Sequence, residues 1–205
     1  MSRFRLGVLV SGSGTNLQSI IERLHEGSGD IEVAVVVSDK PGAYGLKRAE
    51  KAGIPTAVLR PQDYAERVEH DWAVADMLEH HGADLVVLAG YMRVMTPAFL
   101  DRFPYKVVNL HPSLLPSFPG GSAIADALAY GVRITGVTVH LVDEGVDTGP
   151  VILQEAVDIE YNDTVESLAA RIHEVEHRLL PHAIELIAAG RVRFDRDNPR
   201  KVIIE

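Results

Sequence analysis

Short apolar runs alternate along the chain with segments whose apolar residues recur at helical spacing. The runs, rich in β-branched residues, cover positions 4–10, 31–37, 55–59, 83–89 and 105–110. Apolar residues at the spacing of one helix face lie between the first two runs, at 17–24, and again at 64–78. Alternation of this kind predicts βαβ units and therefore a largely parallel sheet.

The second half of the chain continues the pattern with longer elements. Residues 133–142 and 149–159 read as two further strands, separated by "DEGVDT", and residues 165–190 read as a long final helix. We therefore expect an α/β fold: a single domain with a mostly parallel, twisted, Rossmann-like sheet that carries helices on both faces. Residues 191–205 form a tail in this interpretation.

Composition narrows the classes of protein that the chain could represent. With 205 residues, 46% of them hydrophobic, one sizeable core is expected rather than two small ones. No apolar run approaches the roughly 18 residues of a membrane span, and "MSRFRLGVLV" is too short for a signal peptide, so we expect a cytoplasmic protein without a membrane partner. The absence of cysteine removes thiolate nucleophiles and cysteine-bound zinc, and a net charge of −9 disfavours a nucleic-acid partner.

The stretch "NLHPSLLPSFPGG", which begins at Asn109, is the strongest candidate for a functional site. Because successive side chains of a strand face opposite ways, Asn109 and His111 share one face. Pro112 keeps His111 extended, and the carboxyl ends of strands in open parallel sheets are where ligands bind. An isolated Asn-x-His is more often a turn cap beside a buried imidazole, so this motif needs support from elsewhere.

That support comes from "DEGVDTGP", which also follows a predicted strand. It offers three carboxylates, those of Asp143, Glu144 and Asp147, any of which could return toward His111. A carboxylate beside an imidazole favours its protonated form, and an amide beside a cationic imidazole suits the oxyanion that develops in acyl transfer. The residues by themselves thus predict an acyl-transfer site on a parallel sheet.

A second candidate site lies near the start of the chain. "VLVSGSGTNLQS" places Gly12 to Gly14 between the first strand and an amphipathic helix, where free backbone amides can bind a phosphate. The loop is similar to a dinucleotide fingerprint, but Leu17 stands where its third glycine belongs. Asp39, after the second strand, keeps a nicotinamide cofactor open as an alternative, because an acidic residue there can bind a ribose.

Four motifs together resemble the phosphoribosylglycinamide formyltransferase family. They are "SGSGTNLQS", "LVVLAGYMRVM", "NLHPSLLPSFPGG" and "VDEGVDTGPVILQ", and the similarity runs from about residue 5 to 190 in the family's order. The resemblance implies formyl transfer from 10-formyltetrahydrofolate, a co-substrate, to the amine of 5-phosphoribosylglycinamide (GAR), in de novo purine biosynthesis and without a metal. It also implies that the part up to about residue 100 binds phosphate, and that residues 101–190 carry the folate and catalytic groups.

The same resemblance assigns roles to single residues. The catalytic trio would be Asn109, His111 and Asp147. The ribonucleotide would be bound at its phosphate by Gly14, Thr15 and Asn16, and at its sugar or glycinamide portion by Glu176. Folate would be bound by Arg67, Met92, Arg93, Val94, Met95, Asn109, Val142 and Asp143.

Two further expectations concern the loop after the trio's strand. The resemblance implies a cis peptide between Leu115 and Pro116. After "SFPGG" related sequences often carry a histidine, whereas this chain has Ser122, which leaves the loop's contribution open.

An exposed apolar helix face is compatible with a homodimer.

Four other functions remain as alternatives. Methionyl-tRNA formyltransferase resembles a longer chain with a tRNA-contacting domain, and formyltetrahydrofolate hydrolases usually carry an additional regulatory domain. A nicotinamide-dependent oxidoreductase would use the glycine loop, although that loop lacks its third glycine. A metal hydrolase would use His111, His140 and Asp147 as ligands.

Overall fold

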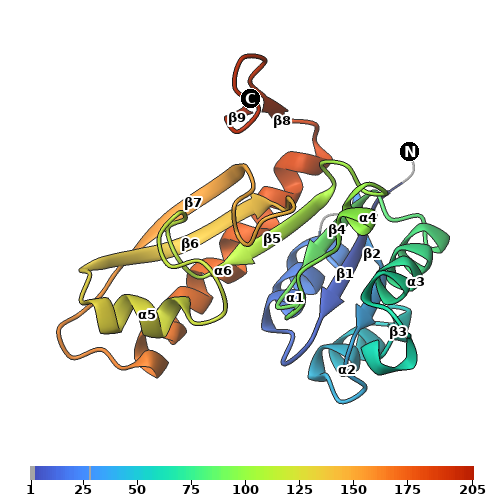
Figure 1. The fold of residues 1–205 in the computed structure, drawn as a ribbon, viewed down its shortest axis with the longest axis horizontal. Helices are drawn as coiled ribbons and strands as arrows, with labels where there is room; N and C mark the ends of the chain where they lie inside the picture. The colour runs from blue at the N-terminus through green and yellow to red at the C-terminus, as the bar shows by residue number, and fades with distance from the viewer. Residues whose placement is uncertain (1–2, 28) are drawn as a thin grey trace. The chain divides into compact units, whose positions relative to one another are not determined.

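The computed structural model describes residues 3–27 and 29–205. Contacts between residues divide the chain into two compact units, residues 1–108 and 109–205, which are described here one at a time (Figure 1).

The first unit is a parallel α/β layer structure. Its strands are β1 (Phe4–Val10), β2 (Ile31–Ser38), β3 (Thr56–Val58) and β4 (Leu85–Leu88), hydrogen-bonded in the order β3-β2-β1-β4 with every pair parallel. Its helical segments are α1 (Thr15–Ile20), the π-helical turn η1 (Ile21–His25), α2 (Tyr44–Lys51), the short 3₁₀ segment η2 (Pro61–Asp63), α3 (Arg67–His80) and α4 (Pro97–Leu100).

Helices cover both faces of these four strands, as two close contacts on β1 demonstrate. A Cβ atom added to Gly7 would lie 2.3 Å from the side chain of Leu78, so α3 packs directly on the strand there. On α2, Gly45 approaches the side chain of Val10, since a Cβ atom there would lie 3.1 Å away. Positions 7 and 10 point to opposite faces of a strand, so α2 and α3 lie on opposite sides. The predicted α/β class, with mostly parallel strands and helices on both faces, is therefore confirmed.

The second unit is built around an antiparallel pair. The strands β5 (Val107–His111), which crosses the boundary between the units, β6 (Ile134–Leu141) and β7 (Val151–Asp158) follow one another in the order β5-β6-β7, and β6 and β7 are antiparallel. The helix α6 (Val165–Ala188) packs against β6 and β7 and contacts α5 (Ala123–Tyr130). The strands β8 (Val192–Phe194) and β9 (Val202–Ile204) form a separate antiparallel hairpin.

Most expected elements are present, with shifted ends and several additions. The helix expected over 64–78 begins at Arg67, because the Glu69 carboxylate accepts a hydrogen bond from the Glu66 amide (3.3 Å) and so caps the helix start there. Helices α2, α4 and α5 were not anticipated, and the expected tail contains the β8-β9 hairpin. None of the helices within residues 3–27 and 29–205 combines the length and hydrophobicity needed to cross a membrane.

Candidate active site

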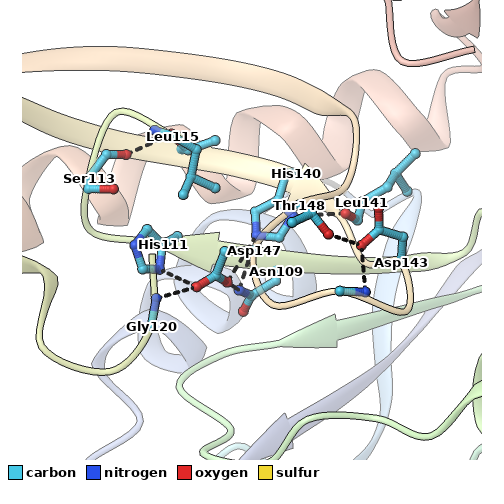
Figure 2. A network of polar contacts seen from close by, with 12 residues as sticks. Asn109, His111, Ser113, Leu115, Gly120, His140, Leu141, Asp143, Asp147 and Thr148 are labelled. Carbon is cyan, nitrogen blue, oxygen red and sulfur yellow. Dashed lines mark hydrogen bonds and ion pairs between the residues drawn. The ribbon is translucent and has the colours of Figure 1, made fainter. Parts of the chain in front are cut away.

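The predicted trio comes together within the second unit (Figure 2). Asn109 and His111 end β5, two residues apart on one face, and Asp147 lies in the loop between β6 and β7. The His111 Nδ1 atom is 3.3 Å from Asp147 Oδ2, and Asn109 Nδ2 donates to Asp147 Oδ1 at 3.3 Å. Of the three carboxylates offered by the sequence, the structure therefore brings Asp147 to the imidazole.

The Asp147 carboxylate is held in its ionised form. Beyond its contacts with Asn109 and His111, Oδ2 accepts a hydrogen bond from the backbone amide of Gly120 at 2.8 Å. The His140 imidazole, the Gly120 amide and the charge of His111 together lower the pKa of Asp147 to about 2, against burial, which raises it. At neutral pH the site therefore contains a fixed negative charge beside His111.

His111 is oriented from both of its ring nitrogens. It is 4% exposed, and its Nε2 lies 2.8 Å from the backbone carbonyl of Phe118. A carbonyl oxygen only accepts, so Nε2 carries a proton, while Nδ1 faces the carboxylate of Asp147, which also only accepts. With a proton on each nitrogen, both nitrogens would face an acceptor, and this cationic form is the one that can stabilise a developing oxyanion.

His140 is a member of this cluster that the acyl-transfer interpretation of the sequence missed. It is buried on β6, and its Nδ1 donates to the backbone carbonyl of Leu141 at 2.8 Å. Its Nε2 lies 3.2 Å from Asn109 Nδ2 and 3.6 Å from Asp147 Oδ1. A neutral ring accepts from Asn109, whereas a protonated ring donates to Asp147. The available signal was its place near the carboxyl end of a predicted strand.

The proline-rich loop after His111 is fixed by the strand pair beneath it. The Thr138 hydroxyl on β6 donates to the carbonyl of Ser113 (2.6 Å) and accepts from the amide of Leu115 (3.1 Å). Gln154 on β7 donates to the carbonyl of Leu115 at 2.9 Å. The Leu115–Pro116 peptide is cis, which confirms the expectation. The loop is thereby held so that Phe118 and Gly120 reach the trio.

The glycine loop of the first unit has one position at which only glycine fits. Gly14 has a φ of +69°, and a Cβ atom there would lie 2.6 Å from the Cα of Gly45 on α2. Its carbonyl accepts from the amide of Gln18 (2.9 Å) and so begins α1, in which Thr15 and Asn16 are the first two residues. The loop therefore packs closely on α2. This packing fixes the backbone, and a fixed backbone is what the proposed phosphate contact requires.

Asp39, the residue that kept the nicotinamide interpretation open, is occupied within the fold. It is 8% exposed, and one of its carboxylate oxygens accepts a hydrogen bond from the Ser11 hydroxyl at 2.7 Å. The same hydroxyl accepts from the amide of Met92 at 3.0 Å. Through Ser11, Asp39 thus links the glycine loop to the segment after β4, and its carboxylate is not directed toward a ribose site.

The residues predicted to bind folate in the first unit lie together. A pocket of about 300 Å³ is lined by Arg67, Met92, Arg93 and Val94, and Arg67 donates to the carbonyl of Val94. Met92 is 68% exposed, whereas Met95 is 3% exposed and packs in the core. The pocket therefore combines apolar surface with two guanidinium groups, which suits a flat aromatic ligand that carries carboxylates.

The remaining predicted residues lie in the second unit. Asp143 accepts hydrogen bonds from the Thr148 hydroxyl (2.6 Å) and the Gly145 amide (3.1 Å), so it shapes the loop that carries Asp147 (Figure 2). Val142 opens the same loop directly after β6, and Glu176 is a buried carboxylate on α6. Within residues 3–27 and 29–205 no group of three or more His, Asp or Glu side chains has the arrangement of a metal site.

Comparison with known proteins places this site in a family. The formyl transferase family model matches residues 4–184. The chain is 41% identical to phosphoribosylglycinamide formyltransferase of Bacillus subtilis, over 88% of this chain and 93% of the relative. The chain belongs to the phosphoribosylglycinamide formyltransferase family. A crystal structure of glycinamide ribonucleotide transformylase 1 from Symbiobacterium toebii covers 98% of this chain and 94% of its own, with 49% identity and a TM-score of 0.95.

Longer proteins also contain a segment that is similar to this chain. The chain is 45% identical to the trifunctional purine biosynthetic protein adenosine-3 of Gallus gallus over 94% of its own length, but it spans only 19% of that relative. The similarity therefore concerns one part of the trifunctional protein. The family membership confirms the resemblance on which the sequence-based assignments depend.

Proposed function

We propose that this chain transfers the formyl group of 10-formyltetrahydrofolate to the amine of GAR, giving formyl-GAR and tetrahydrofolate in de novo purine biosynthesis. The observation that carries the proposal is the cluster of Asn109, His111 and Asp147 in a chain of the formyltransferase family. We further propose that it acts in the cytoplasm.

The reaction requires one bond to form, one to break and one proton to move. The GAR amine attacks the formyl carbon, and the resulting tetrahedral adduct collapses by breaking the bond to the folate nitrogen. Protonated His111 and the amide of Asn109 stabilise the oxyanion of the adduct, a role typically worth about 10²- to 10³-fold in rate for one donor. His111 gives a proton to the departing folate nitrogen and regains one from the attacking amine, either directly or through a water ordered by Asp147.

The contacts of Asn109 add a detail to this proposal. Its Nδ2 group faces both Asp147 and His140. To donate to the oxyanion, the amide must exchange one of these hydrogen bonds for one to the adduct. Catalytic hydrogen bonds commonly tighten only once the substrate is bound, so the exchange fits the proposed role.

Substrate binding is proposed for the two groups of residues that the family resemblance assigns. Gly14, Thr15 and Asn16 would bind the GAR phosphate, and Glu176 its sugar or glycinamide portion. The pocket of Arg67, Met92, Arg93 and Val94 would bind folate, together with Met95, whose side chain is buried. Val142 and Asp143 would form a wall for the pterin. The division near residue 100 into phosphate-binding and folate-binding parts, and the homodimer, stay predictions.

The decisive test mixes the purified protein with GAR and a 10-formyl folate and follows release of the deformylated folate by absorbance. We expect product formation that requires GAR and yields formyl-GAR by mass spectrometry. Folate release at the same rate without GAR would instead identify a hydrolase. No release with either mixture, from protein shown to be folded by circular dichroism, would refute the proposed function.

A further inference from the structure

The C-terminal hairpin touches the loop that carries Asp147. Arg200, in the turn between β8 and β9, donates from Nη2 to the backbone carbonyl of Thr148 at 2.6 Å. The next residue, Lys201, forms a parallel β-bridge with Val151 at the start of β7. The hairpin therefore holds the chain immediately after Asp147 at two points, three residues apart.

The segment that receives these contacts has reason to move if it is released. Asp147 has a φ of +53°, a left-handed conformation that costs aspartate less than most residues but that is still less favourable for it than an extended or right-handed backbone. Its neighbour Thr148 is held at both ends, because its hydroxyl donates to Asp143 and its carbonyl accepts from Arg200. Loss of the second bond releases the carbonyl of the Thr148–Gly149 peptide, one residue beyond Asp147.

The turn that carries Arg200 is itself well ordered by hydrogen bonds. The Asp195 side chain accepts from the amides of Asp197 (2.9 Å) and Asn198 (3.1 Å). The Asn198 side chain accepts from the amide of Arg200 at 3.1 Å. These hydrogen bonds fix the turn, so the Arg200 guanidinium is held in place against the Thr148 carbonyl.

We propose that Arg200 is a positioning residue for the formyl transfer. By holding the Thr148 carbonyl, it keeps the Asp147 carboxylate against Gly120 and His111. Nothing in the family resemblance assigns a role to this residue. Its effect on turnover rests on the proposed function, whereas its effect on the position of Asp147 does not.

The experiment compares Arg200→Ala with Arg196→Ala, a matched control on the same turn. Among the described residues, Arg196 makes no hydrogen bond or ion pair. Because the Gly120 amide donates to Asp147 Oδ2, its hydrogen exchange and its ¹⁵N–¹H resonance report the position of the carboxylate directly. We expect exchange at Gly120 to accelerate about 2- to 5-fold in Arg200→Ala, the range of one exposed charged contact.

Activity supplies the second readout. We expect kcat to fall by a similar factor of about 2 to 5, with KM for GAR unchanged, and Arg200→Lys to restore most of it because an ammonium can also donate to a carbonyl. Arg196→Ala should match the wild type in both measurements. Melting temperatures of all three variants separate a local effect from general loss of stability.

The outcomes distinguish the two proposals. Unchanged Gly120 exchange in Arg200→Ala overturns the positioning role, whatever the activity. Accelerated exchange with full kcat overturns the link between this contact and turnover. Accelerated exchange in a protein whose wild type transfers no formyl group supports the positioning of Asp147 and refutes the proposed function instead.

Discussion

Replacing Asp147 by asparagine removes the negative charge of the trio and leaves its shape. The asparagine oxygen can still accept from the Gly120 amide, and asparagine tolerates the left-handed backbone at this position at least as well as aspartate. We therefore expect a protein that still folds, with its unfolding free energy at neutral pH lowered by up to about 2.5 kcal/mol, the value to which the shifted pKa of Asp147 corresponds. What the variant loses is the charge that stabilises protonated His111.

The structure brackets the size of this loss. For charges 3.3 Å apart near a protein surface, Coulomb's law at an effective dielectric constant of about 20 gives about 5 kcal/mol. This is an upper limit, because the Asp147 side chain is 12% exposed and solvent screens the pair. The lowering of the Asp147 pKa from 3.8 to about 2 corresponds to about 2.5 kcal/mol for all its interactions, net of burial. A loss between these values lowers kcat by about 70- to 5,000-fold.

The assay is steady-state formation of the deformylated folate at saturating GAR and folate, with KM measured for each substrate. We expect kcat to fall while both KM values stay within about threefold of the wild type, because the charge acts on the transition state. Glu144→Gln, which removes the charge of an exposed carboxylate in the same loop, is the control for general loop damage. A kcat within twofold of the wild type, or a loss confined to KM, would refute the reasoning.

Three further predictions follow from other contacts. Gly14→Ala should lower the free energy of unfolding by about 2 kcal/mol or more and weaken GAR binding in calorimetry, because the added Cβ would clash with Gly45 and the residue has a positive φ. Gly12→Ala is the control, because no atom lies within 4 Å of its Cβ, and it should change neither quantity. Tyr91→Phe should be neutral or stabilising by up to about 1 kcal/mol in urea unfolding, because the buried hydroxyl has no partner among the described residues and its pKa is raised by burial; a clear destabilisation would reveal a partner. Since the pKa of Asp147 is lowered to about 2, the stability that its carboxylate contributes is complete above about pH 4 and is lost as pH falls toward 2. The unfolding free energies of wild type and Asp147→Asn should therefore converge over that range. Parallel curves would contradict the ionised carboxylate.

Features that depend on local periodicity could be predicted from the sequence. The alternation of apolar runs with helical stripes predicted the α/β class, because strand and helix periods follow from covalent geometry over a few residues. The same period of two placed Asn109 and His111 on one face of β5. The cis peptide after Leu115 came from the family resemblance, not from any local pattern.

What the sequence left open were pairings between distant residues. Asp143, Glu144 and Asp147 were equivalent candidates in the sequence, and only the path of the loop between β6 and β7 brings Asp147 to His111. His140 joins the cluster because β6 lies beside β5, and the strand order was not predictable.

By itself, then, the sequence determined the class of the fold, the strand that carries the amide and the imidazole, and the family motifs. Only the tertiary structure decided which carboxylate completes the trio, that Asp39 is bound by Ser11, and that a hairpin holds the loop behind Asp147. The physical reason is range. Backbone geometry fixes which side chains share a face within one element, whereas contacts across 28 to 79 residues or more depend on sheet register and loop conformation, which the whole set of packing interactions decides.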